Sequence, residues 1–331
     1  MSELIIGIVS TVNNELLHAD KDWRYFYVGS HHGRTFPQLY PDEDFYYINV
    51  AEPNWDMVNK CDSIYYQSGT VPNKFMVKII DDIKKPIVCY LEGGLTDIMQ
   101  SNLQDLLDFS YIMDRSRIVA FGDEQTIANL QPLTKTEVSF FPLPYPVQLA
   151  EGLKAEFENL GYFKQYDILI PYGFSITWGT TRNGISTLFA CKELIKQYDL
   201  SIAVIEHRGI DDFKAFAKRY EFPDNFVALE PQDHTRYLEL NYRCKFVISL
   251  NYRMVSGRNA IDSAIFDKPY VGSSLVPDVK YLYGGIDVFD IPLVLAFMTK
   301  ALEYPETLAI NKGFYNYINY DYARKRLEEL V

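Results

Sequence analysis

Cysteine and histidine are too scarce and too scattered in this chain of 331 residues to suggest a disulfide framework or a metal centre. Of the five histidines only His31 and His32 are adjacent, and metal binding there would need further ligands. The four cysteines follow neither a paired nor a zinc-like spacing; they are Cys61, Cys89, Cys191 and Cys244. Because Cys89 and Cys244 lie in or beside apolar runs, we expect buried, reduced thiols.

The chain also lacks an excess of positive charge, a long apolar segment and a glycine-rich dinucleotide fingerprint. Its formal net charge of -12 argues against nucleic acid and anionic membranes as partners, and the short basic cluster at residues 324–326 is followed by two glutamates. No apolar run is long enough to span a bilayer, and the first strand, residues 4–9, has no basic leader before it. We therefore expect a cytoplasmic protein. The missing fingerprint argues against a nicotinamide or flavin enzyme.

What the chain does have is a regular alternation of apolar runs of strand length with segments of helical periodicity. The predicted strands are residues 4–9, 24–28, 45–50, 63–66, 87–91, 117–121, 138–141, 167–171, 201–205, 226–229, 246–250 and 270–273. The predicted helices are residues 73–84, 185–197, 211–219, 235–240, 259–266, 291–302 and 315–330, while the form of 150–165 is left open. This alternation predicts an α/β fold with two facing, doubly wound Rossmann-like domains and a cleft between them.

Three prolines within five residues, at positions 142, 144 and 146, exclude helix and sheet interior. Such a stretch suits a stiff connector between domains, so we place the domain boundary near Pro146.

One stretch, residues 244–274, carries the clearest functional pattern. It is predicted to form a strand, a small-residue loop, a helix and a second strand. Ser256, Gly257, Arg258 and Asn259 lie at the start of the helix, where free N–H groups and the positive end of the dipole favour phosphate. Asp262, one turn further, is placed to accept hydrogen bonds from a ribose or sugar hydroxyl. The alternative is a plain connection in which Asp262 is only a favourable first-turn acid.

A second loop, residues 172–184, is rich in glycine, serine and threonine. It ends in Arg182, Asn183 and Gly184 and leads into a predicted helix. A loop of this kind offers backbone N–H groups, hydroxyls and one cation to a diphosphate.

These two stretches resemble the donor-nucleotide motifs of the GT-B glycosyltransferases of family four. Gly257 and Asp262 stand for the Gly and the second Glu of the family pattern, and Met254 stands where the first Glu is expected. In the other loop, Gly173 and the segment 182–184 match in part. That loop has one cation fewer than the family pattern, and either Arg253 or Arg258 is a candidate to supply the second charge.

The resemblance implies a role for each part of the chain. Residues 1–146 would form the acceptor domain, residues 147–310 the donor domain, and residues 311–331 a helix that crosses back to the first domain. Glu92 follows the strand 87–91 at the place of a family His, so it is a candidate general base for an acceptor hydroxyl. The alternative is that Glu92 caps a helix that begins near Thr96.

The resemblance predicts a hexosyltransferase that uses a nucleotide sugar as substrate, acts on an unidentified acceptor and has no other cofactor. Since no Asp-x-Asp motif appears in a donor loop, arginine and the helix dipole are expected to neutralise the leaving group without a metal. Three alternatives stay open. Met254 favours a non-catalytic protein that binds a sugar nucleotide or a partner; the others are a nucleotide-sugar epimerase and a glycosyltransferase that acts on a modified DNA base.

Overall fold

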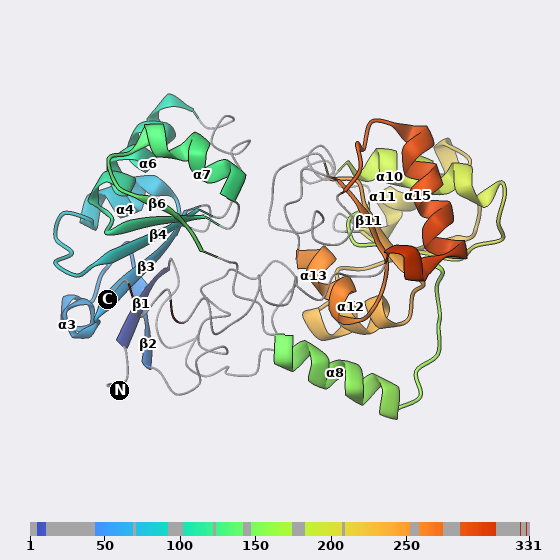
Figure 1. The fold of residues 1–331 in the computed structure, drawn as a ribbon, viewed down its shortest axis with the longest axis horizontal. Helices are drawn as coiled ribbons and strands as arrows, with labels where there is room; N and C mark the ends of the chain where they lie inside the picture. Colours follow the sequence, from blue (N-terminus) through green and yellow to red (C-terminus); the bar gives the residue numbers. More distant parts are fainter. Residues whose placement is uncertain are drawn as a thin grey trace. The chain divides into compact units, whose positions relative to one another are not determined.

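A computed structural model of the chain (Figure 1) describes residues 5–10, 44–68, 71–91, 102–121, 124–141, 147–173, 183–206, 209–251, 258–273 and 285–308, together with Lys325 and Glu329. These residues form two compact units. Those up to Phe141 belong to the first unit, those from Val147 to Leu308 to the second, and Lys325 and Glu329 to the first. The strand predicted at 24–28 lies outside the described residues, as does the helix predicted at 315–330 apart from those two positions.

The first unit is built on a parallel sheet in the order β2-β1-β3-β4-β5-β6. Its strands are β1 (Ile5–Ser10), β2 (Asp44–Asn49), β3 (Ser63–Ser68), β4 (Ile87–Leu91), β5 (Ile118–Phe121) and β6 (Val138–Phe140). Its helices are α3 (Trp55–Lys60), α4 (Asn73–Ile79), α6 (Leu103–Arg115), α7 (Glu124–Leu130) and the 3-10 turn η2 (Gln131–Leu133). The sequence did not predict α3 and α6, and α4 ends five residues before the predicted helix end.

Apolar side chains of the helices hold them on the sheet of the first unit. Val58 of α3, Met76 of α4 and Ile112 of α6 are buried in one core together with Ile64 and Cys89 of the strands. Both α3 and α6 begin at an asparagine whose side chain caps the helix, which satisfies a first-turn N–H group. The described helices α3, α4, α6 and α7 connect strands that follow one another in one direction across the sheet from β2 to β6, so right-handed crossovers place these helices on one face.

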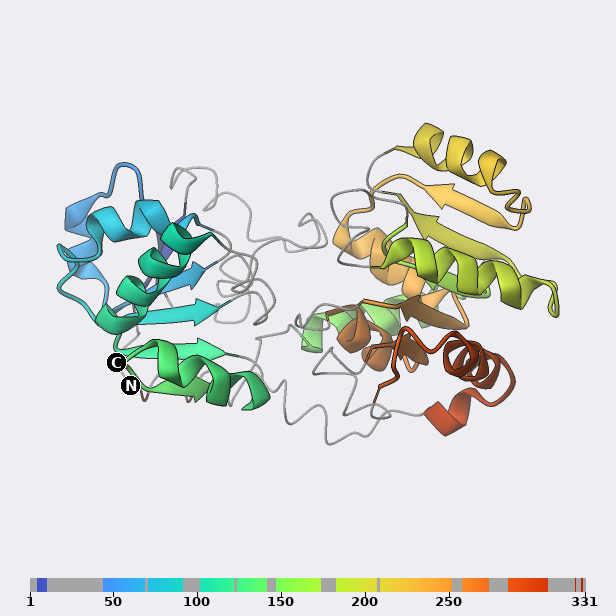
Figure 2. The same ribbon diagram turned by 90° about the horizontal axis from the view of Figure 1, so that it is seen from above.

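The second unit repeats the plan with a parallel sheet in the order β11-β10-β7-β8-β9. Its strands are β7 (Ile168–Ile170), β8 (Ile202–Ile205), β9 (Phe226–Leu229), β10 (Phe246–Ser249) and β11 (Tyr270–Gly272). Its helices are α8 (Val147–Asn159), α10 (Gly184–Ile195), α11 (Ile210–Arg219), α12 (His234–Tyr242), α13 (Arg258–Ile265), α15 (Ile291–Glu303) and the 3-10 turn η3 (Pro305–Leu308). Figure 2 shows that the strands within each sheet run in one direction.

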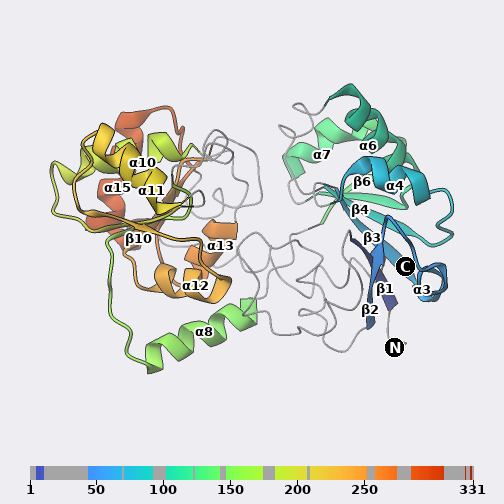
Figure 3. The ribbon, with the colours of Figure 1, turned by 180° about the vertical axis from the view of Figure 1, so that it is seen from behind.

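Helices cover both faces of the second sheet, as Figures 1 and 3 show: α10, α11 and α15 lie on one face, and α8, α12 and α13 on the other. The strands β7, β8, β10 and β11 are buried along their whole length, which explains their nearly continuous apolar sequences. Two doubly wound parallel sheets confirm the predicted fold class. The segment left open at 150–165 is mostly helix, since α8 extends to Asn159.

The buried, reduced cysteines that the sequence predicted are confirmed, since all four cysteines are free and buried. Burial raises the pKa of the Cys61 thiol to about 11 and that of the Cys89 thiol to about 12. In the part of the chain that the structure describes, no helix is long and apolar enough to cross a membrane.

Candidate functional site

The strand order of the second unit identifies one edge of its sheet as a ligand site. From β7 the chain moves outward through β8 to β9, whereas β10 lies on the other side of β7 and leads to β11. The direction of winding therefore reverses between β7 and β10. In open α/β sheets, ligands bind beyond the carboxyl ends of the two strands at such a switch point. The sequence predicted its two binding loops after these same strands.

The two predicted glycines on the β7 side are required by close packing. A Cβ atom at Gly184, the first residue of α10, would lie 2.2 Å from the carbonyl oxygen of Gly173. A Cβ atom at Gly173 would lie 2.5 Å from Cγ1 of Val204 and 2.8 Å from a carboxylate oxygen of Glu206. The start of α10 is thus pressed directly onto the backbone at the end of β7, and only glycine allows that approach.

Asn183 precedes α10 in the left-handed backbone region, with φ of 52°, a conformation that asparagine adopts more readily than most residues. Its side chain makes no capping hydrogen bond to the helix. The side chain is also buried, and its Nδ2 has no hydrogen-bond partner among the described residues. An unused buried donor is costly unless a ligand or water completes it. Asn183 therefore lies at the helix start as an available donor beside the first N–H groups of α10.

The β10 side of the switch point is lined by buried polar groups. Asn251, two residues after the end of β10, is 2% exposed, and so is Asp262 in the second turn of α13. Asp262 lies close enough to Tyr237 of α12 for its negative charge to affect the hydroxyl of that tyrosine, as does Tyr172 after β7. Burial is the main cause that raises the pKa of Tyr237 well above its usual value, with Asp262 and Tyr172 adding to it.

The structure thus brings four of the predicted site residues to the switch point: Gly173, Asn183, Gly184 and Asp262. Arg258 is the first residue of α13, so its backbone is placed there as well. The remaining predicted residues lie outside the described part of the chain; they are Glu92, Arg182, Arg253, Ser256 and Gly257. Met254 lies outside it too.

Sequence reasoning missed two residues at this edge. Glu206 directly follows β8 and is fully buried against Gly173. The sequence does contain a signal for Glu206, because a carboxylate directly after an apolar strand is the same pattern that made Glu92 a candidate. Thr187 was also missed, although it is buried and contacts both sides of the switch point through its hydroxyl.

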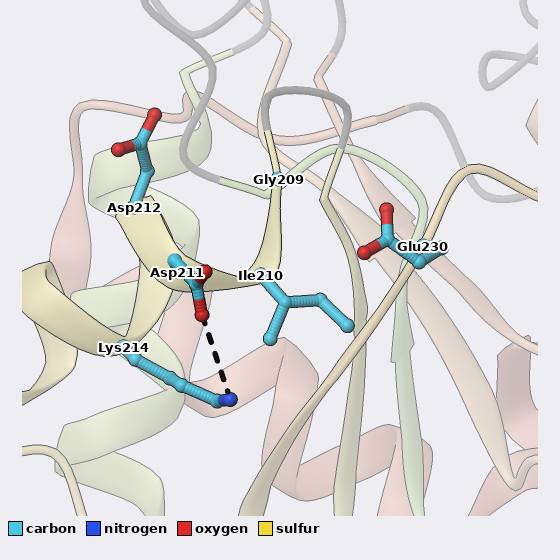
Figure 4. Close-up of a pocket in the computed structure, with 6 residues that line it drawn as sticks. All are labelled: Gly209, Ile210, Asp211, Asp212, Lys214 and Glu230. Atoms are coloured by element: carbon cyan, nitrogen blue, oxygen red, sulfur yellow. Dashed lines mark ion pairs between the residues drawn. The ribbon is translucent and has the colours of Figure 1, made fainter.

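A cavity of about 450 Å³ opens beside this edge, at the carboxyl ends of β8 and β9. Figure 4 shows its lining residues: Gly209, Ile210, Asp211, Asp212, Lys214 and Glu230. Glu230 projects from the end of β9 on one side, and the first turns of α11 form the other. Lys214 is paired with Asp211 at 3.7 Å, so the lining carries a net negative charge.

No model of a protein family matches the sequence, and no curated protein matches it in sequence. Solved structures do match it in fold. The N-terminal domain of Candida albicans trehalose-6-phosphate phosphatase covers 100% of this chain and 97% of its own length, with a TM-score of 0.68 and 9% identity. Anabaena HepE, solved with UDP and glucose, and Burkholderia xenovorans UDP-forming trehalose-phosphate synthase each match over 99% of both chains at 10% identity, with TM-scores of 0.68 and 0.62.

The chain has the GT-B fold of nucleotide-sugar glycosyltransferases. The predicted resemblance is therefore confirmed at the level of the fold. With about a tenth of residues identical, the likeness shows the shared fold, and the chemistry of the site depends on its own residues.

Proposed function

We propose that the protein is a glycosyltransferase that takes a sugar from a nucleotide-sugar donor. The observation that carries this proposal is the convergence of the starts of α10 and α13, with the buried amide of Asn183, at the switch point of the second unit. Helix starts of this kind favour a diphosphate. HepE, which shares the fold, was solved with UDP and with UDP-glucose.

In this proposal the diphosphate binds between the two helix starts. Asn183 and the N–H groups that begin at Gly184 hold it from the α10 side, with Arg182 as a cation. Ser256, Gly257 and the start of α13 hold it from the other side, with Arg253 or Arg258 as a second cation. The arginines and the helix dipoles neutralise the leaving diphosphate, so transfer needs no metal.

The two carboxylates of the proposal have separate roles. Asp262 accepts hydrogen bonds from the ribose hydroxyls. Glu92 meets the acceptor and acts as its general base. The acceptor is unidentified.

A thermal-shift screen against UDP, GDP, ADP and their common sugars tests the donor site. A ligand that binds only the folded state raises its stability, so one nucleotide should stand out. Arg182→Ala and Asp262→Ala should abolish that shift. Arg219→Ala is the matched control, because Arg219 lies at the far end of α11 and should leave the shift intact. If no nucleotide shifts the wild-type protein, the proposal fails.

Met254 favours a second candidate, a GT-B protein that binds a sugar nucleotide without transferring the sugar. In the family pattern an acid stands at this position, and the thioether of methionine is only a weak acceptor for the hydroxyls of a sugar. Slow hydrolysis of the bound sugar nucleotide without acceptor separates the two functions. A transferase should release the free sugar, whereas a binding protein should show the thermal shift and no release.

A further inference from the structure

The side chain of Asn259 lies in the first turn of α13 with one half of its amide engaged. Its Oδ1 accepts a hydrogen bond from the hydroxyl of Tyr237 at 3.2 Å. The residue is 6% exposed. The contact with Tyr237 uses the oxygen of this amide and leaves its Nδ2 available as a donor in the first turn of α13.

Tyr237 determines which way this amide faces. The tyrosine is 1% exposed on α12, and burial, followed by the charges of Asp262 and Tyr172, holds its pKa far above neutral pH. Its hydroxyl therefore stays protonated and donates to Oδ1 of Asn259. With the oxygen held, the nitrogen is left as the free end of the amide.

The backbone at Asn259 is fixed by a second set of bonds between α12 and α13. The hydroxyl of Ser263 donates to the carbonyl oxygen of Asn259 at 2.7 Å. Nδ2 of Asn241 donates in turn to the Ser263 hydroxyl at 3.3 Å. Both Ser263 and Asn241 are fully buried. Neither the chain nor the amide of Asn259 is therefore free to turn away, and a donor fixed in advance loses little entropy when it binds.

We propose that Nδ2 of Asn259 binds an oxygen of the nucleotide diphosphate, and that Tyr237 is the residue that positions it. This inference rests on the proposed function. It adds a residue that the family pattern did not point to. Asn259 would then correspond to Asn183 in its role. A neutral side-chain amide would bind the diphosphate on each side of the switch point, alongside the N–H groups of α10 and α13.

Calorimetric titration with UDP, and with GDP and ADP in parallel, tests the proposal on four proteins: wild type, Asn259→Ala, Tyr237→Phe and the double variant. A hydrogen bond to a charged group is lost in Asn259→Ala, so its Kd should rise about tenfold or more. Tyr237→Phe should raise the Kd by a smaller factor, because the amide is kept and only its orientation is lost. The double variant should match Asn259→Ala, since in this proposal Tyr237 affects the nucleotide through that amide.

Tyr66→Phe is the matched control. Tyr66, in the first unit, is equally buried and donates to Oδ1 of Asn73 at 2.6 Å. Its replacement should lower the melting temperature and leave the nucleotide Kd unchanged. Should Asn259→Ala fold poorly, Asn259→Ser also removes the amide nitrogen and should show the same rise.

The outcomes separate this inference from the proposed function. If the wild type binds none of the three nucleotides, the proposed function fails and the inference with it. If the wild type binds one and Asn259→Ala binds it with the same Kd, only the inference is overturned. If Asn259→Ala weakens binding and Tyr237→Phe does not, the positioning role of Tyr237 is refuted.

Discussion

The backbone N–H of Leu250 donates to Oγ1 of Thr187 over 3.3 Å, which joins the end of β10 to α10. The same hydroxyl donates to the carbonyl oxygen of Asn183 at 3.0 Å. One buried side chain thus links the two sides of the switch point, although Thr187 and Leu250 are 63 residues apart in the sequence. The position of Asn183 relative to β10 depends on this link.

Thr187→Val should therefore loosen the switch point with little change in volume. It leaves the N–H of Leu250 without its acceptor, at a cost of about 1–3 kcal/mol for a buried donor. Hydrogen exchange measured by mass spectrometry should show faster exchange in the peptide that contains β10, and nucleotide binding should weaken. Thr187→Ser keeps the hydroxyl and should exchange nearly as the wild type. A damaging Thr187→Ser beside a Thr187→Val that behaves like the wild type would show that packing of the methyl group matters instead.

Gly184→Ala should be among the most damaging single substitutions in the second unit. The new Cβ would meet the carbonyl oxygen of Gly173, whose backbone is itself held by a 3.0 Å hydrogen bond from its N–H to Ile205. Overpacking against backbone should cost about 3 kcal/mol in the free energy of unfolding, measured by urea denaturation, and should abolish nucleotide binding.

Gly152→Ala is the control for that substitution. Gly152 lies inside α8, and a Cβ atom there would meet no atom of the described residues within 4 Å. The change should therefore stabilise the protein by about 0.5–1 kcal/mol, because alanine favours the helix and restricts the unfolded chain. A destabilised Gly152→Ala would contradict the assigned packing of α8.

The elements that the sequence predicted best are those whose burial leaves a simple pattern. The residues of β9 were predicted without error, and β10 within one residue, because short apolar runs between polar residues are typical of parallel strands. The helix α6 was missed because Leu103 and Leu107 are exposed and blur its periodicity. In α8 the buried positions Ala150, Leu153 and Phe157 have helical spacing, but Gly152 weakened the signal.

The candidate site was predictable as two loops, and its internal contacts were not. Glycines before a helix indicate close approach to a ligand, yet the approach of Gly184 to Gly173 is a contact within the chain. Tyr237 is one of 26 tyrosines, and its bond to Asn259 joins two helices across 22 residues. Periodicity identifies which face of a helix is buried, but not which polar groups meet there.

Asp167, at the opposite end of β7 from the site, should make stability depend on acid pH. Burial alone would raise the pKa of its carboxyl, but hydrogen bonds from Lys164, Ser201 and Lys245 outweigh burial and hold the pKa well below its usual value. The folded state therefore binds this proton less readily than the unfolded chain. The stabilisation is complete above the unfolded pKa and is lost as the pH falls from about 5 through the unfolded pKa toward the lower folded value.

Urea midpoints measured between about pH 7 and pH 2 check this expectation. Asp167→Asn cannot titrate at this position, so it should be less stable at neutral pH and should lose less stability on acidification. Parallel pH profiles for the wild type and the variant would show that other carboxylates govern acid unfolding.

A substitution of Asp262 can show whether its carboxylate binds the ribose of the nucleotide or only packs against the neighbouring helix. Its carboxylate is nearly buried beside Tyr237, so a loss of nucleotide affinity in a variant would not by itself prove a ribose contact. The affinity ratio of UDP to 2′-deoxy-UDP tests the ribose contact directly, because the two ligands differ only in one ribose hydroxyl. We expect the wild type to prefer UDP by about tenfold, as for a hydrogen bond to a charged group, and Asp262→Asn to bring the ratio close to one. An unchanged ratio would leave Asp262 as a buried packing residue of α13 and would place the ribose elsewhere.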